Sequence, residues 1–366
     1  MIRVPFLDLK DNVAALRPAL DAAFARVMDS GWFILGPELE AFEAEFAHFI
    51  GVPHAIGTGN GLDALRIALE ASGVGPGDDV IVPAHTFIAT WLAVTQLGAV
   101  PVAVEPAAGR FNVAADAIEA ALTPRTKAIV VVHLYGEPVE MEPVLALAAA
   151  RGIPVIEDAA QAHGATRHGV ACGSFGHAAA FSFYPAKNLG AFGDAGALVT
   201  GDEALRQRAR SLRNYGAVTK YDHAEAGINS RLDELQAALL RVVLPEIEGW
   251  NARRRAIAAR YDEGLADLPG LEQPRSLPGN VPAWHLYVVR SARRAALQAA
   301  LAEVGIGTQI HYPTPIYRLP PYAGLGPACE TPTDRIAREA LSLPMNPFLS
   351  DPQIERVIGA VRAACS

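Results

Sequence analysis

The sequence predicts an α/β protein with a mostly parallel sheet, because short β-branched runs alternate with amphipathic helical patterns. The runs are almost wholly apolar, as is typical of a sheet covered by helices on both faces. We expect strands at 80–82, 100–104, 128–132, 154–156, 179–183 and 197–200. The helical patterns between them cover 61–72, 87–97, 113–122, 141–151 and 202–214.

The length of 366 residues predicts two domains, since one small core does not usually reach this size. A helical stretch over 231–265, with Pro245 as a break, leads into a smaller region. That region is predicted to hold a strand at 284–290 and helices at 293–305, 330–343 and 351–364. We place the boundary at 243, which gives a large domain over 1–243 and a small α+β domain over 244–366.

Composition and charge exclude several classes of protein. The formal net charge is −8 without a long run of like charges, so nucleic acid is not an expected partner. We interpret the basic run 253–255 as a solvated helix face. Cys172, Cys329 and Cys365 have no paired spacing, so we expect neither a disulfide framework nor a metal site. The N-terminus lacks an apolar signal core and no stretch is apolar enough to span a membrane, so a cytoplasmic location is expected.

A lysine follows the predicted strand at 179–183. In the segment 181–188 (FSFYPAKN), Lys187 comes just after the apolar run and beside a Pro turn. Ligands bind at the carboxyl ends of parallel strands. A lysine desolvated there loses proton affinity and becomes an amine nucleophile that can form a Schiff base. For an arbitrary lysine a solvated surface loop is the commoner explanation, in about nine cases of ten.

Two other strand ends carry complementary signals. In the segment 155–164 (VIEDAAQAHG), Asp158 follows an apolar strand, where its carboxylate can pair with a protonated pyridine nitrogen; a helix N-cap is the alternative. The segment 56–65 (IGTGNGLDAL) has the pattern of a strand, a Gly-rich turn and a helix start, whose amides can bind a phosphate. Its glycine spacing differs from the dinucleotide-binding pattern. Together the three signals indicate a site for pyridoxal phosphate (PLP).

The chain resembles the nucleotide-sugar aminotransferases of the DegT/DnrJ type, which are fold-type-I PLP enzymes. The resemblance covers almost the whole chain, and its motifs occur in the family's order at 4–9, 34–38, 59–65, 82–87, 157–161, 181–190, 193–196, 229–234 and 310–313. It implies the fold-type-I architecture, in which a mostly parallel seven-stranded sheet flanked by helices is followed by a smaller domain. The loop 311–332, dense in Pro and Tyr, is expected to line the site.

The resemblance assigns cofactor contacts by matching motif. Lys187 corresponds to the lysine that forms the Schiff base and moves the proton, and Asp158 to the partner of the pyridine nitrogen. Gln161 corresponds to a residue near the ring hydroxyl, and Phe87 to the aromatic side chain that stacks on the ring. The phosphate contacts correspond to Ser182, the backbone of Gly61 and Leu62, and Asn229.

The assignment also bears on the oligomeric state of the protein and on how it binds the cofactor phosphate. The residue at Asn229 is donated by the second subunit in the family, which implies a homodimer with shared sites. Many members have Thr where this chain has Leu62, so only backbone N–H groups remain at that position.

The resemblance also implies transfer of an amino group from L-glutamate to a nucleotide-linked keto-sugar, as in deoxysugar biosynthesis. Five residues lie in segments similar to substrate-contacting regions of the family: Tyr184, Lys220, Tyr221, His311 and Tyr312. For Lys220, a solvated loop lysine is as good an explanation as a substrate contact. For His311, a packed histidine is as good an explanation as a substrate contact. The segments 133–136, 161–164, 214–216 and 284–286 look most like members that aminate C3 of a dTDP-linked 3-keto-6-deoxyhexose.

Several alternatives stay open at this point. The substrate can instead be a UDP-linked 3-keto or 4-keto sugar. A non-catalytic binding or regulatory protein can share the fold. Relatives that dehydrate a sugar lack the Schiff-base lysine, so the presence of Lys187 counts against that activity. The Gly-rich turn also allows a nicotinamide-dependent dehydrogenase, which a bound nicotinamide cofactor in place of PLP would support.

Overall fold

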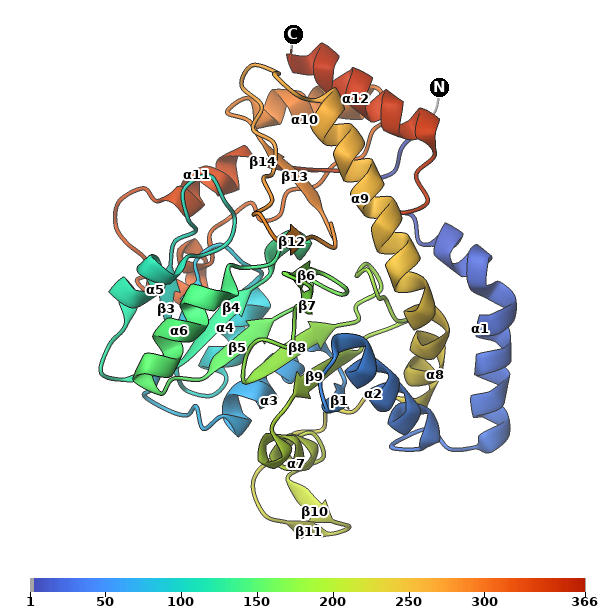
Figure 1. The fold of residues 1–366 in the computed structure, drawn as a ribbon, viewed down its shortest axis with the longest axis vertical. Helices are drawn as coiled ribbons and strands as arrows, with labels where there is room; N and C mark the ends of the chain where they lie inside the picture. Colours follow the sequence, from blue (N-terminus) through green and yellow to red (C-terminus); the bar gives the residue numbers. More distant parts are fainter. Residues whose placement is uncertain (1–2, 366) are drawn as a thin grey trace.

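The structure, a computed structural model, describes residues 3–365 and is centred on a seven-stranded sheet (Figure 1). The strand order is β1-β9-β8-β5-β4-β2-β3. The strands are β1 (His54–Thr58), β2 (Asp79–Pro83), β3 (Val100–Val104), β4 (Thr126–Val132), β5 (Val155–Asp158), β8 (Ala178–Ser182) and β9 (Gly196–Thr200). Strand β9 runs antiparallel to both its neighbours, and the other neighbouring pairs are parallel. The predicted mostly parallel sheet is confirmed.

Helices cover both faces of this sheet because successive strand side chains point to opposite sides. Val80 and Val82 of β2 pack with residues of α3 and α4, whereas Ile81 between them packs with residues of α5 and α6. The helices of this part of the chain are α1 (Lys10–Ser30), α2 (Pro37–Ile50), α3 (Gly61–Ala71), α4 (Ile88–Thr95), α5 (Ala115–Ala121), α6 (Met141–Arg151), α7 (Glu203–Leu212) and α8 (Glu234–Val243). Within residues 3–365 no helix is long and apolar enough to cross a membrane.

The predicted break at Pro245 is confirmed. Helix α8 gives way to a 3₁₀ turn, η2 (Leu244–Glu246), and the chain continues as α9 (Ile247–Gly264). Proline lacks the N–H that a helix interior requires. Ile247, at the start of α9, packs in the core beside the large sheet, whereas Ile257 belongs to a second core.

The second core surrounds an antiparallel strand pair at the top of Figure 1. It contains β13 (Tyr287–Arg290), β14 (Ala340–Leu343), α9, α10 (Arg294–Glu303) and α12 (Asp351–Cys365). The helix predicted over 330–343 is wrong in its last part, because α11 (Pro332–Glu339) ends before β14. Leu341 and Leu343 enter the core while Ser342 between them binds the 309–311 segment, so cross-strand packing outweighs the local helical pattern.

Two small sheets complete the described elements. One joins β6 (Thr166–Arg167), β7 (Val170–Ala171) and β12 (Asn280–Val281). The other is a hairpin of β10 (Ala217–Thr219) and β11 (Asp222–His223), which projects below α7 at the bottom of Figure 1. Three short 3₁₀ turns are η1 (Leu134–Gly136), η3 (Ile316–Arg318) and η4 (Pro320–Tyr322).

A buried carboxylate, that of Glu234, caps the N-terminus of α2, although it is nearly two hundred residues away along the chain. Glu234, in the first turn of α8, is 1% exposed. Its oxygens accept hydrogen bonds from the backbone amides of Gly36, Glu38 and Leu39 at 2.8, 2.8 and 3.0 Å. The first amides of a helix have no acceptor within the helix and carry partial positive charge. Glu234 therefore fixes α2 to α8.

The interpretation of 253–255 as a solvated helix face is wrong for Arg254. This side chain is 5% exposed, and its Nη1 donates to the backbone oxygens of Trp284 at 3.2 Å and Met345 at 3.0 Å. Burial lowers the pKa of Arg254 to about 10. Consecutive helical residues point about 100° apart, so three arginines in a row cannot share one face.

We predict that Glu234→Ala lowers the free energy of unfolding by about 3 kcal/mol, because buried amides lose a charged acceptor. The urea midpoint measures this change. Glu248→Ala is the matched control, since Glu248 is an exposed first-turn residue of α9, and it should stay within about 0.5 kcal/mol of wild type. Equal midpoints for the two variants would contradict the role given to Glu234.

Candidate active site

Strands of the central sheet bring the predicted acid and lysine together. Strand β5 ends at Asp158, and β8 ends at Ser182 shortly before Lys187. The two strands are adjacent and parallel, with Asp158 paired to Ala180. Asp158 and Lys187 consequently lie close enough for each charge to shift the pKa of the other.

A threonine pair holds the Asp158 carboxylate. Its Oδ2 accepts a hydrogen bond from the Thr90 hydroxyl at 2.8 Å, and its Oδ1 accepts from the Ala160 amide at 3.2 Å. The Thr86 hydroxyl lies 2.9 Å from that of Thr90, and both threonines are buried. Burial raises the pKa of Asp158, whereas the Thr90 hydrogen bond and the Lys187 charge lower it. A carboxylate fixed in this way suits the stabilisation of a protonated pyridine nitrogen.

The ε-amine of Lys187 sits in a poorly solvated environment. Its backbone N–H donates to the Tyr184 carbonyl at 2.8 Å, which closes the turn after β8. The side chain keeps partial exposure, yet desolvation lowers its pKa from 10.5 to about 8, with the Asp158 charge opposing this shift. At neutral pH a useful fraction of such an amine is unprotonated. Lys187 is therefore equipped to attack an aldehyde and to accept a proton.

The start of α3 forms a phosphate cradle beside β8. Asn60 caps the helix, accepting from the Asp63 amide at 2.8 Å, and the part of the chain that the structure describes offers no acceptor to the Gly61 and Leu62 amides. A Cβ added to Gly61 would lie 2.6 Å from the Cβ of Ser182, so only glycine allows this close approach. Free amides at a helix start next to a serine hydroxyl fit the phosphate of PLP.

Gln161 connects the strand ends to the C-terminal part of the chain. Its Oε1 accepts from the Tyr135 amide at 2.6 Å, and its Nε2 donates to the Tyr312 hydroxyl at 3.1 Å. The Tyr135 hydroxyl in turn donates to the His311 carbonyl and lies 2.8 Å from Nε2 of His85. Burial lowers the pKa of His85 to about 3, which keeps this imidazole neutral. The bonds hold segment 311–312 next to Gln161.

Phe87 has the exposure that a stacking surface needs. It precedes α4, is 52% exposed, and its ring centroid lies 5.5 Å from that of Tyr312. The rest of the loop 311–332 differs from the prediction, because Tyr317 and Tyr322 are buried in the core rather than lining the site. Tyr322 packs against Trp91 of α4 with 5.2 Å between ring centroids.

The predicted substrate residues divide into two groups. His311 and Tyr312 lie at the site, where burial and the Lys187 charge lower the pKa of His311 to about 4, and its Nδ1 lies 2.8 Å from the Ser342 hydroxyl. Tyr184 shares the turn of Lys187 and is 55% exposed.

Lys220 and Tyr221 are not brought to this cluster within one chain. They stand at the tip of the projecting β10–β11 hairpin, where Tyr221 is 85% exposed and Nζ of Lys220 is 5.2 Å from its ring. Asn229 is exposed and bridges to Asn214. Its neighbour Ser230 accepts a hydrogen bond from the Gly59 amide at 3.0 Å, so Asn229 directly precedes a residue that is bonded to the turn before α3.

Sequence reasoning missed three residues of the site. Thr90 carries a weak signal, since it is a hydroxyl residue in the otherwise apolar first turns of the helix predicted over 87–97. Tyr135 lies in the family-like segment 133–136, but nothing in that segment predicts its role, because its backbone φ of 61° and its link to His311 depend on the fold. His285 lies 3.2 Å from Asn188 through Nδ1, and burial lowers its pKa well below the usual value.

Comparison with known proteins agrees with this geometry. Residues 15–362 match the DegT/DnrJ/EryC1/StrS aminotransferase family, and the chain belongs to it. It is 52% identical over 362 residues to a dTDP-3-amino-3,4,6-trideoxy-alpha-D-glucose transaminase of Streptomyces venezuelae, covering 98% of this chain and 96% of that relative. It is 50% identical over 362 residues to the erythromycin biosynthesis sensory transduction protein EryC1 of Saccharopolyspora erythraea, covering 98% and 99%.

A solved relative has nearly the same fold. The crystal structure of Streptomyces venezuelae DesV in complex with a ketimine intermediate matches with a TM-score of 0.98 at 52% identity, covering 100% of this chain and 99% of that chain. The predicted family, fold class and cofactor are confirmed. The protein is a PLP-dependent sugar aminotransferase.

We predict that Thr90→Val moves the acid limb of the kcat/KM pH profile upward by about one pH unit. In the wild-type protein the Thr90 hydrogen bond lowers the pKa of Asp158, so in the variant the protonated acid persists to higher pH. A hydrogen bond to a charged group contributes about 1.5–3 kcal/mol, and about 1.4 kcal/mol corresponds to one pH unit. Thr90→Ser keeps the hydroxyl and should retain the wild-type profile. Thr95→Val is the control on the same helix, and a Thr90→Val profile that overlays it would contradict the role of Thr90.

Proposed function

We propose that this aminotransferase transfers an amino group from L-glutamate to C3 of a 3-keto-6-deoxyhexose carried by dTDP. The observation that supports the transfer most strongly is Lys187, desolvated beside Asp158 at the end of parallel strands. The choice of C3 and of dTDP rests on the Streptomyces venezuelae relative, whose name describes a dTDP-linked 3-amino sugar. The three free cysteines among the described residues suit a cytoplasmic location.

The described residues fit PLP, and we assign its contacts on that basis. Lys187 would hold the aldehyde carbon, Asp158 the ring nitrogen and Gln161 the ring hydroxyl, while Phe87 would cover the ring. The phosphate would bind the Gly61 and Leu62 amides and the Ser182 hydroxyl. We further propose that 1–243 is the PLP-binding domain and 244–366 the small domain, in keeping with the two separate cores.

Asp158 and Lys187 would have different roles in transamination. PLP, when bound, supplies a ring that withdraws electrons from the carbon next to the reacting nitrogen. Asp158 stays ionised and keeps the ring nitrogen protonated. The amine of Lys187, released when the donor amine takes its place, would accept a proton from the α-carbon of the donor as a base and would deliver it as an acid to the cofactor carbon that carries the nitrogen. The same residues act in reverse order on the sugar, so the kinetics are ping-pong.

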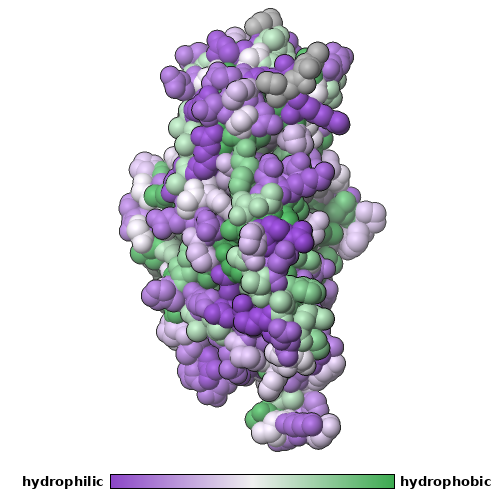
Figure 2. Space-filling model, turned by 90° about the vertical axis from the view of Figure 1, so that its right-hand side faces the viewer, coloured by the Kyte–Doolittle hydropathy of each residue, from purple (hydrophilic) through white to green (hydrophobic). Residues whose placement is uncertain are grey.

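A homodimer with shared sites is part of this proposal. Large apolar side chains stay exposed on α1 and the turn after it: Phe24, Met28, Trp32 and Phe33, at 48%, 50%, 56% and 49%. Figure 2 views the side of the molecule that carries α1 and shows apolar groups over its middle, with the hairpin projecting at the lower end. A second copy covering this face would remove apolar area from water. The hairpin would then carry Lys220 and Tyr221, and the neighbouring segment Asn229, to the partner's site.

A regulatory role without catalysis is the second candidate, because one relative is named a sensory transduction protein. The presence of Lys187, Asp158 and the phosphate cradle favours catalysis. The deciding experiment incubates the protein with PLP, ¹⁵N-labelled L-glutamate and dTDP-3-keto-6-deoxyglucose. Mass spectrometry detects the labelled amine and NMR locates it at C3. Amination only of UDP-linked or 4-keto sugars would overturn the substrate assignment, and no amination of any sugar would favour the regulatory role.

We predict that the rate at which the cofactor-free protein captures PLP rises with pH and levels off above about pH 8. Only the unprotonated amine attacks an aldehyde, and the pKa of Lys187 is about 8 instead of 10.5. Growth of the visible absorption band gives the rate. Lys187→Ala should show no band, and Lys127→Ala, which removes an exposed lysine, should behave as wild type. A rate that still climbs at pH 10 would contradict the desolvated amine.

A subunit-mixing experiment tests the shared site. Lys187→Ala and Asn229→Ala are each expected to be inactive or weak as pure dimers. In a hybrid dimer one site carries both defects and the other carries none, so random mixing should restore about one quarter of wild-type activity. Activity that stays at the average of the two parents would show that Asn229 does not act across subunits.

A further inference from the structure

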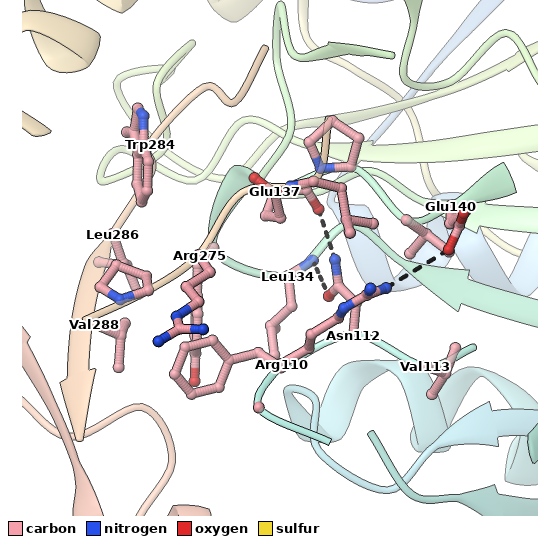
Figure 3. A pocket seen from close by; sticks show the side chains of 17 residues that line it. Arg110, Asn112, Val113, Leu134, Glu137, Glu140, Arg275, Trp284, Leu286 and Val288 are labelled. Atoms are coloured by element: carbon pink, nitrogen blue, oxygen red, sulfur yellow. Dashed lines mark hydrogen bonds and ion pairs between the residues drawn. The ribbon is translucent and has the colours of Figure 1, made fainter. Parts of the chain in front are cut away.

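A second cavity lies behind the wall of the active site (Figure 3). It is lined by residues from 109–113, from 134–140 around η1 and from 274–288, and it is a narrow cavity of about 40 Å³ that is partly open to solvent. Of the candidate active-site residues only Tyr135 lines it, and Tyr135 separates it from Gln161 and His311. A ligand here would occupy a site distinct from that of PLP.

The floor of this cavity is apolar. Leu134, Leu286 and Val288 are buried side chains that line it, and the rings of Phe111 and Trp284 complete the lining. Figure 3 shows Leu286 and Val288 along one edge, next to the Arg275 guanidinium. Such a surface suits a flat apolar ring, whose transfer from water is favourable.

An unpaired cation faces this floor. Among residues 3–365 no acceptor binds the Arg275 side chain, which is exposed at the rim. Arg110, on another side of the cavity, has only a loose ion pair with Glu140 at 3.6 Å. A guanidinium without a partner presents a planar fork that matches the two oxygens of a carboxylate.

The acidic groups nearby already have hydrogen-bond or ion-pair partners within the chain. The Glu137 carboxylate accepts from the Ser276 hydroxyl at 2.9 Å, the Leu277 amide at 3.1 Å and the Asn280 amide group at 2.5 Å. Glu140 lies 3.8 Å from Arg167 as well as near Arg110. The arginine at the rim therefore remains the group that can take up a new anion.

We propose that this cavity is a second binding site for a small aromatic carboxylate, with the ring on the apolar floor and the carboxylate on Arg275. This inference does not rest on the proposed substrate. The loose pair of Arg110 allows that side chain to turn toward the same anion.

Titration calorimetry on the PLP-loaded protein tests the site with 2-naphthoate as the probe. We expect one molecule bound per chain, binding weakened at least about tenfold in Arg275→Ala, and intermediate binding in Arg275→Lys, which keeps charge but loses the fork. Arg210→Ala, an exposed arginine of α7, is the matched control and should bind as wild type. The uncharged 2-naphthamide should bind at least about tenfold more weakly.

Three results would overturn the proposal: no binding of 2-naphthoate to the wild-type protein, equal binding by Arg275→Ala, or binding of 2-naphthamide as tight as that of the acid. Amino transfer can be measured on the same samples. A failure of this second site is therefore distinguishable from a failure of the proposed reaction.

Discussion

Lys187 and Asp158 carry opposite charges, and burial favours the neutral form of each side chain. Desolvation lowers the pKa of the amine and raises that of the acid, while their mutual attraction opposes both shifts. The resulting balance leaves an amine that is partly unprotonated near neutral pH next to an acid that can still ionise. Transamination requires both properties at once, and the parallel pairing of β5 and β8 supplies them in one place.

The surrounding contacts keep this pair in position. Thr90, on α4, orients the Asp158 carboxylate through a hydrogen bond from its hydroxyl. Asn188, directly after Lys187, donates from its side-chain amide to Asn251 and to the Ala283 carbonyl, each at 2.8 Å. The lysine turn is thus tied both to α9 and to the chain approaching β13, so the two cores and the site form one connected structure.

Much of this architecture is predictable from sequence because its causes are local. Apolar runs at 80–82 and 197–200, set between helical patterns, favour strands buried on both faces, and Pro245 favours a break in the helix. Lys187, Asp158 and the glycine turn stand next to such strands, so their gathering follows from topology alone. The resemblance to a known family then supplies the roles.

Other features depend on partners far away in the chain and leave no local signal. Residues 340–343 continue a helical pattern but pair with β13, and Arg254 belongs to a basic run yet is buried against two carbonyl groups. Tyr135 reaches the site only through a positive φ and a bond to the His311 carbonyl. Lys220 and Tyr221 illustrate the same limit, since no local signal shows that their hairpin projects away from the cluster around Lys187.

The central claim is that Lys187 holds PLP and that the bound cofactor takes the amino group of L-glutamate. An absorption spectrum of the purified protein with PLP, recorded before and after addition of L-glutamate, tests it most directly. We expect a visible band that L-glutamate bleaches and that a keto-sugar acceptor restores. Absence of the band would contradict the role of Lys187, and a band unchanged by L-glutamate would contradict the proposed donor.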